Sequence, residues 1–169
     1  MGDSDITDIH TLVTALGAAD ADMRADAAER LCRAGDRARE AAVALVRACG
    51  DDDDRVRDWS VAALEELGPP AAADVAALVP LAGGRHPLVA YWAVTLLGRS
   101  GKDAVAATAA LAACLESPVD AAVAERAAWA LGKIGPGASA GRPALERAAA
   151  VADPRLARLA REALDSIGA

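Results

Sequence analysis

A glycine recurs at an almost constant spacing along the whole chain. Its copies stand at positions 35, 68, 101, 135 and 168. A leucine precedes each glycine by four residues, as Leu31, Leu64, Leu97, Leu131 and Leu164. A fixed period of roughly 33 residues is typical of repeat architectures, in which each repeat buries its apolar face against its neighbours. The spacing therefore predicts a stack of short, similar repeats.

Each repeat is expected to begin with a helix, A, that ends at the glycine. Fifteen residues before each glycine stands Asp20, Asp53, His86, Asp120 or Asp153. Aspartate is a good N-cap, because its short side chain accepts hydrogen bonds from the free amides of the first turn. Pro87 and Pro154 follow two of these positions directly, where a missing N–H costs nothing. Trp59 lies in the A helix of the sequence VRDWSVAALEELG.

A second helix, B, is expected after each glycine. Ten residues beyond the glycine stands Leu45, Leu78, Leu111 or Leu145, and Leu12 lies ten residues after Gly2. The chain is rich in alanine and holds 2% aromatic residues, which favours helix over sheet. We therefore expect one all-α domain over residues 1–169, with about five repeats. The predicted ranges are 4–17 (B only), 20–50, 53–83, 86–117, 120–152 and 153–168 (A only).

Two stretches carry a resemblance to a known family. DPRLARLAREALDSIG (153–168) and ERAAWALGKIGPGASAGRPALE (125–146) resemble HEAT repeats, in particular the short class also found in phycobilisome lyases. The resemblance implies a right-handed α-solenoid, or superhelix. It also implies a ladder of Asp and Arg columns, which this chain keeps only as Asp20 with Arg24 and Asp53 with Arg57. Later repeats place Ala90, Ala124 and Ala157 in the Arg column, so we expect a partial ladder.

Charge and composition limit the classes of partner. A net charge of −7 gives no overall positive footprint for nucleic acid or for an anionic membrane. No apolar run approaches the ~20 residues that span a bilayer. Cys32, Cys49 and Cys114 form no metal or redox motif, so we expect reduced, largely buried thiols in a cytoplasmic protein. The skew toward Ala, Arg, Asp and Gly suggests a GC-rich, bacterial genome.

Two surfaces are candidate partner sites. The A helices hold all four aromatic residues, and other repeats fill the same columns with charge, which predicts partial exposure; they are Trp59, Tyr91, Trp92 and Trp129. These residues could form one contact patch, or the indoles could lie flat over alanines as packing. The resemblance places the B helices on the concave side, where small residues would form a docking trough with arginines at its ends. The principal trough positions are Arg47, Ala77, Ala110 and Arg147, accompanied by Glu40, Ala44, Ala73, Pro80, Ala106, Ala113, Ala140 and Ala144. The alternative is an alanine-rich surface that merely reflects composition.

Two short segments depart from the repeat. Pro80 is expected to interrupt a B helix, because it removes a backbone donor and clashes with the preceding turn. His86 is expected to be a weak N-cap or a loop residue. The acidic run 51–54 lacks the alternating ligands of a calcium loop. We therefore expect it to be a solvated linker in which Asp53 caps the next helix.

The sequence favours binding over catalysis. His10 and His86 are the only histidines and neither precedes a glutamate, which excludes the His-Glu pairs of HEAT-like di-iron hydroxylases. We expect no catalytic residue, cofactor or metal, and predict a protein-interaction scaffold with a protein partner. The alternative is a subunit or domain of a bilin lyase-like enzyme; a HEAT-like nucleic-acid-acting protein is less favoured. The first B helix, with Ile6, Ile9, Leu12, Val13 and Leu16, is poorly capped, so end-to-end self-association is expected there.

Overall fold

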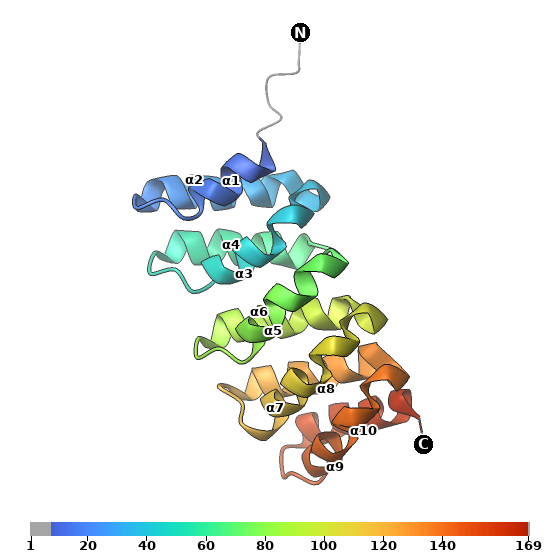
Figure 1. The fold of residues 1–169 in the computed structure, drawn as a ribbon. Helices are drawn as coiled ribbons and strands as arrows, with labels where there is room; N and C mark the ends of the chain where they lie inside the picture. Colours follow the sequence, from blue (N-terminus) through green and yellow to red (C-terminus); the bar gives the residue numbers. More distant parts are fainter. Residues whose placement is uncertain (1–7, 169) are drawn as a thin grey trace. The chain divides into compact units, whose positions relative to one another are not determined.

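The computed structural model describes residues 8–168, which are helical without any β-strand. The chain divides into two compact units, a first unit of residues 1–68 and a second unit of residues 69–169. In Figure 1 the first unit runs from blue to cyan and the second from green to red. The described helices of the first unit are α1 (Ile9–Ala15), α2 (Ala21–Ala34), the 3₁₀ helix η1 (Gly35–Ala41), α3 (Ala42–Ala48) and α4 (Asp54–Glu66). The predicted single domain stays a prediction.

The second unit repeats the same pairing of helices. Its elements are η2 (Ala72–Asp74), α5 (Val75–Ala82), α6 (Pro87–Arg99), η3 (Gly101–Ala107), α7 (Thr108–Glu116), α8 (Ala121–Ile134), η4 (Gly135–Gly141), α9 (Arg142–Ala149) and α10 (Pro154–Ile167). The A helices α6, α8 and α10 lie side by side in this order, and the B helices α7 and α9 also contact each other (Figure 1). This is the neighbour-to-neighbour packing that the repeat predicted.

The A helices begin where the cap residues predicted. Asp20 and Asp53 accept hydrogen bonds from the amides of Met23 (3.0 Å) and Arg55 (2.9 Å). Asp120 and Asp153 cap α8 and α10 in the same way. His86 stands at the start of α6 but makes no capping hydrogen bond with its side chain. The prediction is therefore confirmed for the four aspartates, and His86 is an uncapped start.

Four of the five landmark glycines end an A helix with a left-handed backbone. The φ angles of Gly35, Gly101, Gly135 and Gly168 are positive. This is the left-handed region that side chains with a Cβ rarely adopt. The first three lead into 3₁₀ helices that pass directly into α3, α7 and α9. Gly68 differs, because α4 already ends at Glu66 and Leu67 has an extended backbone.

The leucine columns form the core of each unit. The A-helix leucines 31, 64, 97 and 131 and the B-helix leucines 45, 78, 111 and 145 are all fully buried. Leu164 is only half-buried. It lies on α10, the last helix of the row, which has α8 as its neighbour on one side. Burial of each leucine therefore depends on a flanking repeat, as expected for this architecture.

Pro80 does not interrupt its helix. It lies inside α5, which continues to Ala82, so the predicted break is wrong. Proline removes only one backbone donor, and α5 ends two residues later, so few helical hydrogen bonds depend on the missing N–H. The exposed position of Pro80 also leaves room for its ring.

The acidic run 51–54 is exposed at Asp52 and Asp54 and caps α4 through Asp53, as predicted, but Asp51 makes it a structural joint. The Arg24 Nε and Nη2 atoms donate to the Asp51 carboxylate at 2.7 and 2.9 Å, and the Asp51 side chain is only 13% exposed. Arg24 also donates to the carbonyl oxygens of Ala18 and Ala19. Arg57 donates to the Asp51 carbonyl oxygen at 2.6 Å. The solvated reading is therefore wrong for Asp51, and the Arg column of the expected ladder bonds to this run.

Hydrogen bonds lower the pKa of two carboxyl groups in the joint. The guanidinium of Arg24 lowers the pKa of Asp51. Hydrogen bonds from Arg55 lower the pKa of Asp53 to about 2. Arg55 also pairs with Asp22 at 2.8 Å, so it links the start of α4 to the start of α2. Both carboxylates are therefore held in their charged form within the first unit.

The three cysteines are free thiols. Cys49 and Cys114 are buried, and Cys32 is half-buried. Burial raises the pKa of Cys49 to about 12, and it also raises the pKa of Cys114. The Cys114 Sγ donates to the Ala82 carbonyl oxygen at 3.3 Å. Within residues 8–168, no helix is both long and apolar enough to span a membrane.

Candidate functional site

The two tryptophans that share a sequence column have different surroundings. Trp59 on α4 is 37% exposed, whereas Trp92 on α6 is 6% exposed. Partial exposure was expected for both and is wrong for Trp92. The reason is that α6 contacts α5, α8 and η3, so nearly all of its faces are covered. The Arg99 guanidinium lies 5.6 Å from the centroid of the Trp92 ring system, and Trp92 Nε1 has no hydrogen-bond partner within the described residues. Trp92 is thus a packing residue.

Trp129 is half-buried and lies against a glycine of the neighbouring A helix. A Cβ atom added at Gly98 on α6 would overlap the Trp129 ring. The absence of a side chain at Gly98 therefore lets the indole lie close to the backbone of α6. The six-membered ring of the indole thus packs against α6, and a contact of Trp129 with a partner stays a prediction.

An arginine joins Trp129 to the one tyrosine. The Arg126 guanidinium lies 4.8 Å from the Tyr91 ring centroid and 5.1 Å from that of Trp129. One of its Nη atoms donates to the Tyr91 hydroxyl oxygen. Lys133 approaches the same indole, with Nζ at 5.9 Å from the ring centroid. The cations thus lie at cation–π distance from half-buried aromatic rings.

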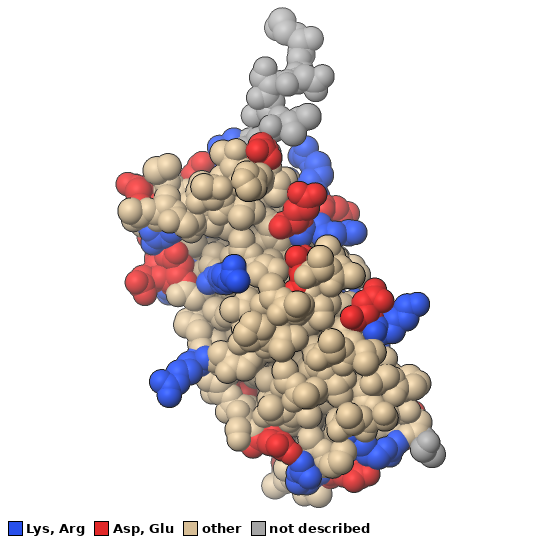
Figure 2. Space-filling view, in the orientation of Figure 1, with Lys and Arg blue, Asp and Glu red and all other residues tan. Residues whose placement is uncertain are grey.

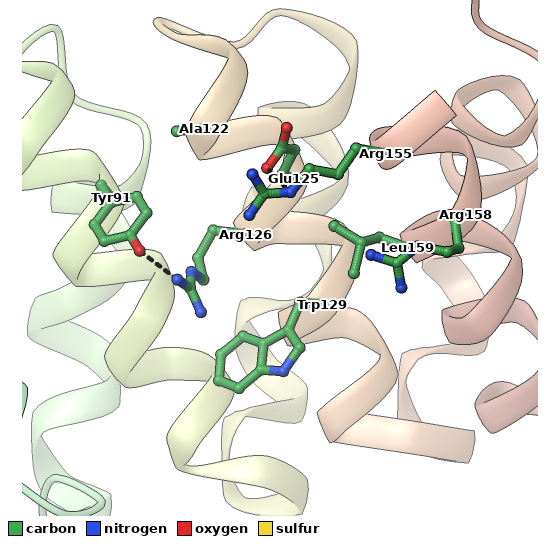
Figure 3. A pocket seen from close by; sticks show the side chains of 8 residues that line it. All are labelled: Tyr91, Ala122, Glu125, Arg126, Trp129, Arg155, Arg158 and Leu159. Carbon is green, nitrogen blue, oxygen red and sulfur yellow. Dashed lines mark hydrogen bonds and ion pairs between the residues drawn. The ribbon is translucent and has the colours of Figure 1, made fainter. Parts of the chain in front are cut away.

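These side chains line an open pocket of about 210 Å³ between α6, α8 and α10, which we name the Arg126 pocket. Figure 3 shows Arg126 between Tyr91 and Trp129, with Arg155 and Arg158 reaching in from α10. Its lining residues are Tyr91, Ala122, Glu125, Arg126, Trp129, Arg155, Arg158 and Leu159. Arg155 pairs with Glu125 at 2.8 Å, and Arg158 pairs with Glu162 at 2.6 Å. Three guanidinium groups and one carboxylate therefore line the pocket.

The small residues of the predicted trough lie on or just before the B helices of the second unit. Ala73, Pro80, Ala106, Ala113 and Ala140 are exposed, and Ala77 and Ala110 are half-buried. Figure 2 shows that uncharged side chains cover most of this face over α5, η3 and α7. A groove of about 450 Å³ opens beside Ala110, Ala113 and Val119. Ala144 is buried under neighbouring helices, so its predicted exposure is wrong.

The arginines expected at the trough ends are both exposed. Arg147 lies on α9 and pairs with Glu116 of α7 in the second unit. Arg47 lies on α3 in the first unit, where Glu40 is also exposed and Ala44 is half-buried. Within residues 8–168, no cluster of three or more His, Cys, Asp or Glu side chains has the arrangement of a metal site.

A comparison with models of protein families shows the family of this chain. The family model for HEAT repeats matches residues 75–165, which is more than half of the chain. The chain belongs to the HEAT-repeat family. A search of curated proteins found no significant match.

Three solved structures with the fold of this HEAT-repeat chain are engineered or designed proteins. An engineered protein is 22% identical with a TM-score of 0.65, covering 96% of this chain and 80% of its own. A second engineered protein is 23% identical with a TM-score of 0.64, and the alignment covers 95% of this chain and 48% of its own. A designed armadillo repeat protein, solved in complex with the peptide (KR)4, is 18% identical with a TM-score of 0.67. The alignment covers 94% of this chain and 81% of the designed protein. At these identities the likeness shows the helical-repeat fold alone.

The Arg126 pocket was not found from the HEAT-repeat sequence. A usable signal was present, because Arg126 and Leu159 occupy the column of Trp59 and Trp92, nine residues before the glycine. Residues of one column, and of the column beside it, lie next to each other on neighbouring A helices. That comparison would have placed Arg126 beside Tyr91.

Proposed function

We propose that this chain is a non-enzymatic interaction module that contacts a protein partner through the helices of its second unit. The observation that carries the proposal is the Arg126 pocket, where half-buried Tyr91, Arg126 and Trp129 meet at the surface of three helices. Tryptophan, tyrosine and arginine are the residues most enriched at binding hot spots. Helices packed side by side hold these side chains in place before binding, which lowers the entropy that a partner must overcome.

The trough on the B helices is a second contact surface in this proposal. Its alanines let a partner helix or backbone approach closely, and the groove beside Ala110 and Ala113 provides depth. The designed armadillo repeat protein was solved with a peptide, so a similar stack of helical repeats can hold an extended chain. We also propose a cytoplasmic location, which suits three free thiols.

Capture of partners from the native host by immobilised chain tests this proposal. The wild type should retain a protein that Arg126→Ala loses, while Trp59→Ala on the first unit should retain it. Ala110→Glu should interfere only if the B-helix trough is the contact surface. Circular dichroism checks that each variant is folded. No reproducible protein partner would contradict the module, and an absorbance change on adding a bilin would favour the lyase-like alternative.

The first B helix supports a separate proposal of self-association. Within α1 and its end, Leu12 and Leu16 are buried, whereas Ile9 and Val13 are half-buried. Ile6, which belongs to the same apolar set, lies outside the described residues. A mass that increases with concentration in sedimentation, and that Val13→Glu reduces to the monomer, would support end-to-end association. A monomeric mass at high concentration would contradict it.

A further inference from the structure

We infer that the Arg126 pocket binds the carboxylate side chains of an acidic protein segment. The inference rests on the proposed function, because it names the chemical class of partner that the same site would accept. It follows from three properties of the pocket: the state of Arg126, the excess of positive charge, and the adjoining hollow.

Arg126 is held in place but keeps donors for a ligand. Within residues 8–168 it forms no ion pair, and its hydrogen bond goes to the Tyr91 hydroxyl. A guanidinium carries five N–H donors in a rigid fork that matches a carboxylate. The rings of Tyr91 and Trp129 already restrict the side chain, so little further freedom is lost on binding. A carboxylate is the group that completes this arrangement best.

The other charges of the pocket favour the same ligand. Arg155 and Arg158 add two guanidinium groups, and Glu125 is the one carboxylate of the lining. The side chains of Arg155 and Arg158 are largely exposed. The pair of Arg158 with Glu162 is therefore a surface ion pair of low net value, whereas the Glu125 side chain that pairs with Arg155 is only 17% exposed. An incoming carboxylate can share or replace these partners, and the same charges repel a basic segment.

The adjoining hollow points to a segment rather than a small anion. A hollow of about 320 Å³ continues from the Arg126 pocket and shares Trp129 and Leu159 with it. Lys133 and Glu162 line this second hollow, and Glu162 already pairs with Arg158. Two neighbouring hollows that share an indole, the first with an excess of guanidinium groups, can accept successive side chains of an extended chain. Trp129 would then contact the aliphatic part of the segment.

Fluorescence anisotropy with labelled peptides tests the inference. The probes are a hexapeptide of alternating Asp and Glu, the basic peptide (KR)4, and a hexapeptide of alternating Asn and Gln. The acidic probe should bind the wild type, and Arg126→Gln should weaken it about tenfold or more, because charge-assisted hydrogen bonds are lost. Arg126→Lys, which keeps the charge without the fork, should have an intermediate effect. Lys102→Gln is the matched control, since it removes one exposed charge of the same unit outside the pocket.

The outcomes separate this inference from the proposed function. Selective binding of the acidic probe, lost in Arg126→Gln and kept in Lys102→Gln, supports it. Equal or tighter binding of (KR)4, or no binding of the acidic probe while a protein partner is still captured through Arg126, overturns the acidic class and leaves the interaction module standing. A single-stranded oligonucleotide that binds more tightly through Arg126 also overturns it. If the wild type neither binds the acidic probe nor captures a protein partner, both proposals are contradicted.

Discussion

The two units share one helical repeat but differ in charge. The first unit holds 8 basic and 16 acidic residues, a formal charge of −8, whereas the second holds 10 and 9, a formal charge of +1. The −7 of the whole chain therefore arises in the first unit. Three of the four aromatic residues lie in the second. An argument about partners that uses only the total charge misses this difference, because each surface carries the charge of its own unit.

The same repeat position shows how the units differ in packing. In the first unit the column holds Arg24 and Arg57, and Arg24 binds Asp51 of the following joint. In the second unit the column holds Ala90, Ala124 and Ala157, which are at most 3% exposed. The same position of the repeat thus accepts either an arginine in an ion pair or a small residue in close contact with its neighbours.

Ala124→Arg should be the most damaging exchange between the two packing types. It places the arginine of the first unit at a position of the second that is 2% exposed and has no counterpart to Asp51. Burying an unpaired charge typically costs about 3 kcal/mol or more. Urea unfolding followed by circular dichroism should show a strongly lowered midpoint or an unfolded chain. Stability close to that of the wild type would mean that the column is not closed in the second unit.

Gly98→Ala tests the close contact between α6 and α8. The new Cβ would overlap the Trp129 ring, so the indole must move or α8 must shift. Overpacking of this kind costs about 1–3 kcal/mol. The free energy of unfolding should fall, and tryptophan fluorescence should shift as Trp129 becomes more exposed. Gly83→Ala is the matched control, because a Cβ there meets no atom within 4 Å. An equal effect of both substitutions would rule out the contact as the cause.

Arg24→Ala tests the ion pair of the first unit. The substitution removes two hydrogen bonds to Asp51 and those to the carbonyl oxygens of Ala18 and Ala19. The urea midpoint should fall, by less than for Ala124→Arg, since solvent can still reach the remaining carboxylate. The double variant with Asp51→Ala should be less destabilised than the sum of the two single variants. Additive effects would show that the pair does not couple the two residues.

Acid should weaken the first unit through the carboxyl groups of the joint. The pKa of Asp51 is lowered and that of Asp53 is about 2, below the ordinary value near ~4. Their contribution is therefore present above pH ~4 and is lost as the pH falls toward 2. Hydrogen-exchange protection factors in α2 and α4 should fall between pH 5 and pH 2.5. Asp51→Asn has no carboxylate to protonate, so its protection factors should fall less over this pH range. A fall equal to that of the wild type would assign the effect to other groups.

The sequence predicted what depends on one helix and its immediate neighbours. Aspartate caps, glycine turns and inward leucines follow from periodicity, because they depend on local hydrogen bonds and on one face of a helix. Trp59 and Trp92 show the limit, since they share a column of the repeat and yet are 37% and 6% exposed. The Arg24–Asp51 pair depends on the path of a loop, and the Arg126 pocket needs three helices at once. These features required the structure.

His86→Asp should stabilise the second unit by a small amount. His86 has the extended backbone of an N-cap residue, yet its side chain makes no capping hydrogen bond. Aspartate at the equivalent position caps α2, α4, α8 and α10. Restoring the cap should add about 1 kcal/mol, through the hydrogen bond and through a negative charge at the positive end of α6. Thermal unfolding of His86→Asp and His86→Ala side by side separates the gain of the cap from the loss of histidine. A higher thermal stability of His86→Asp, but not of His86→Ala, would show that the irregular start of α6 is a local defect in an otherwise regular repeat. No gain would mean that the backbone before Pro87 does not present its free amides to a cap.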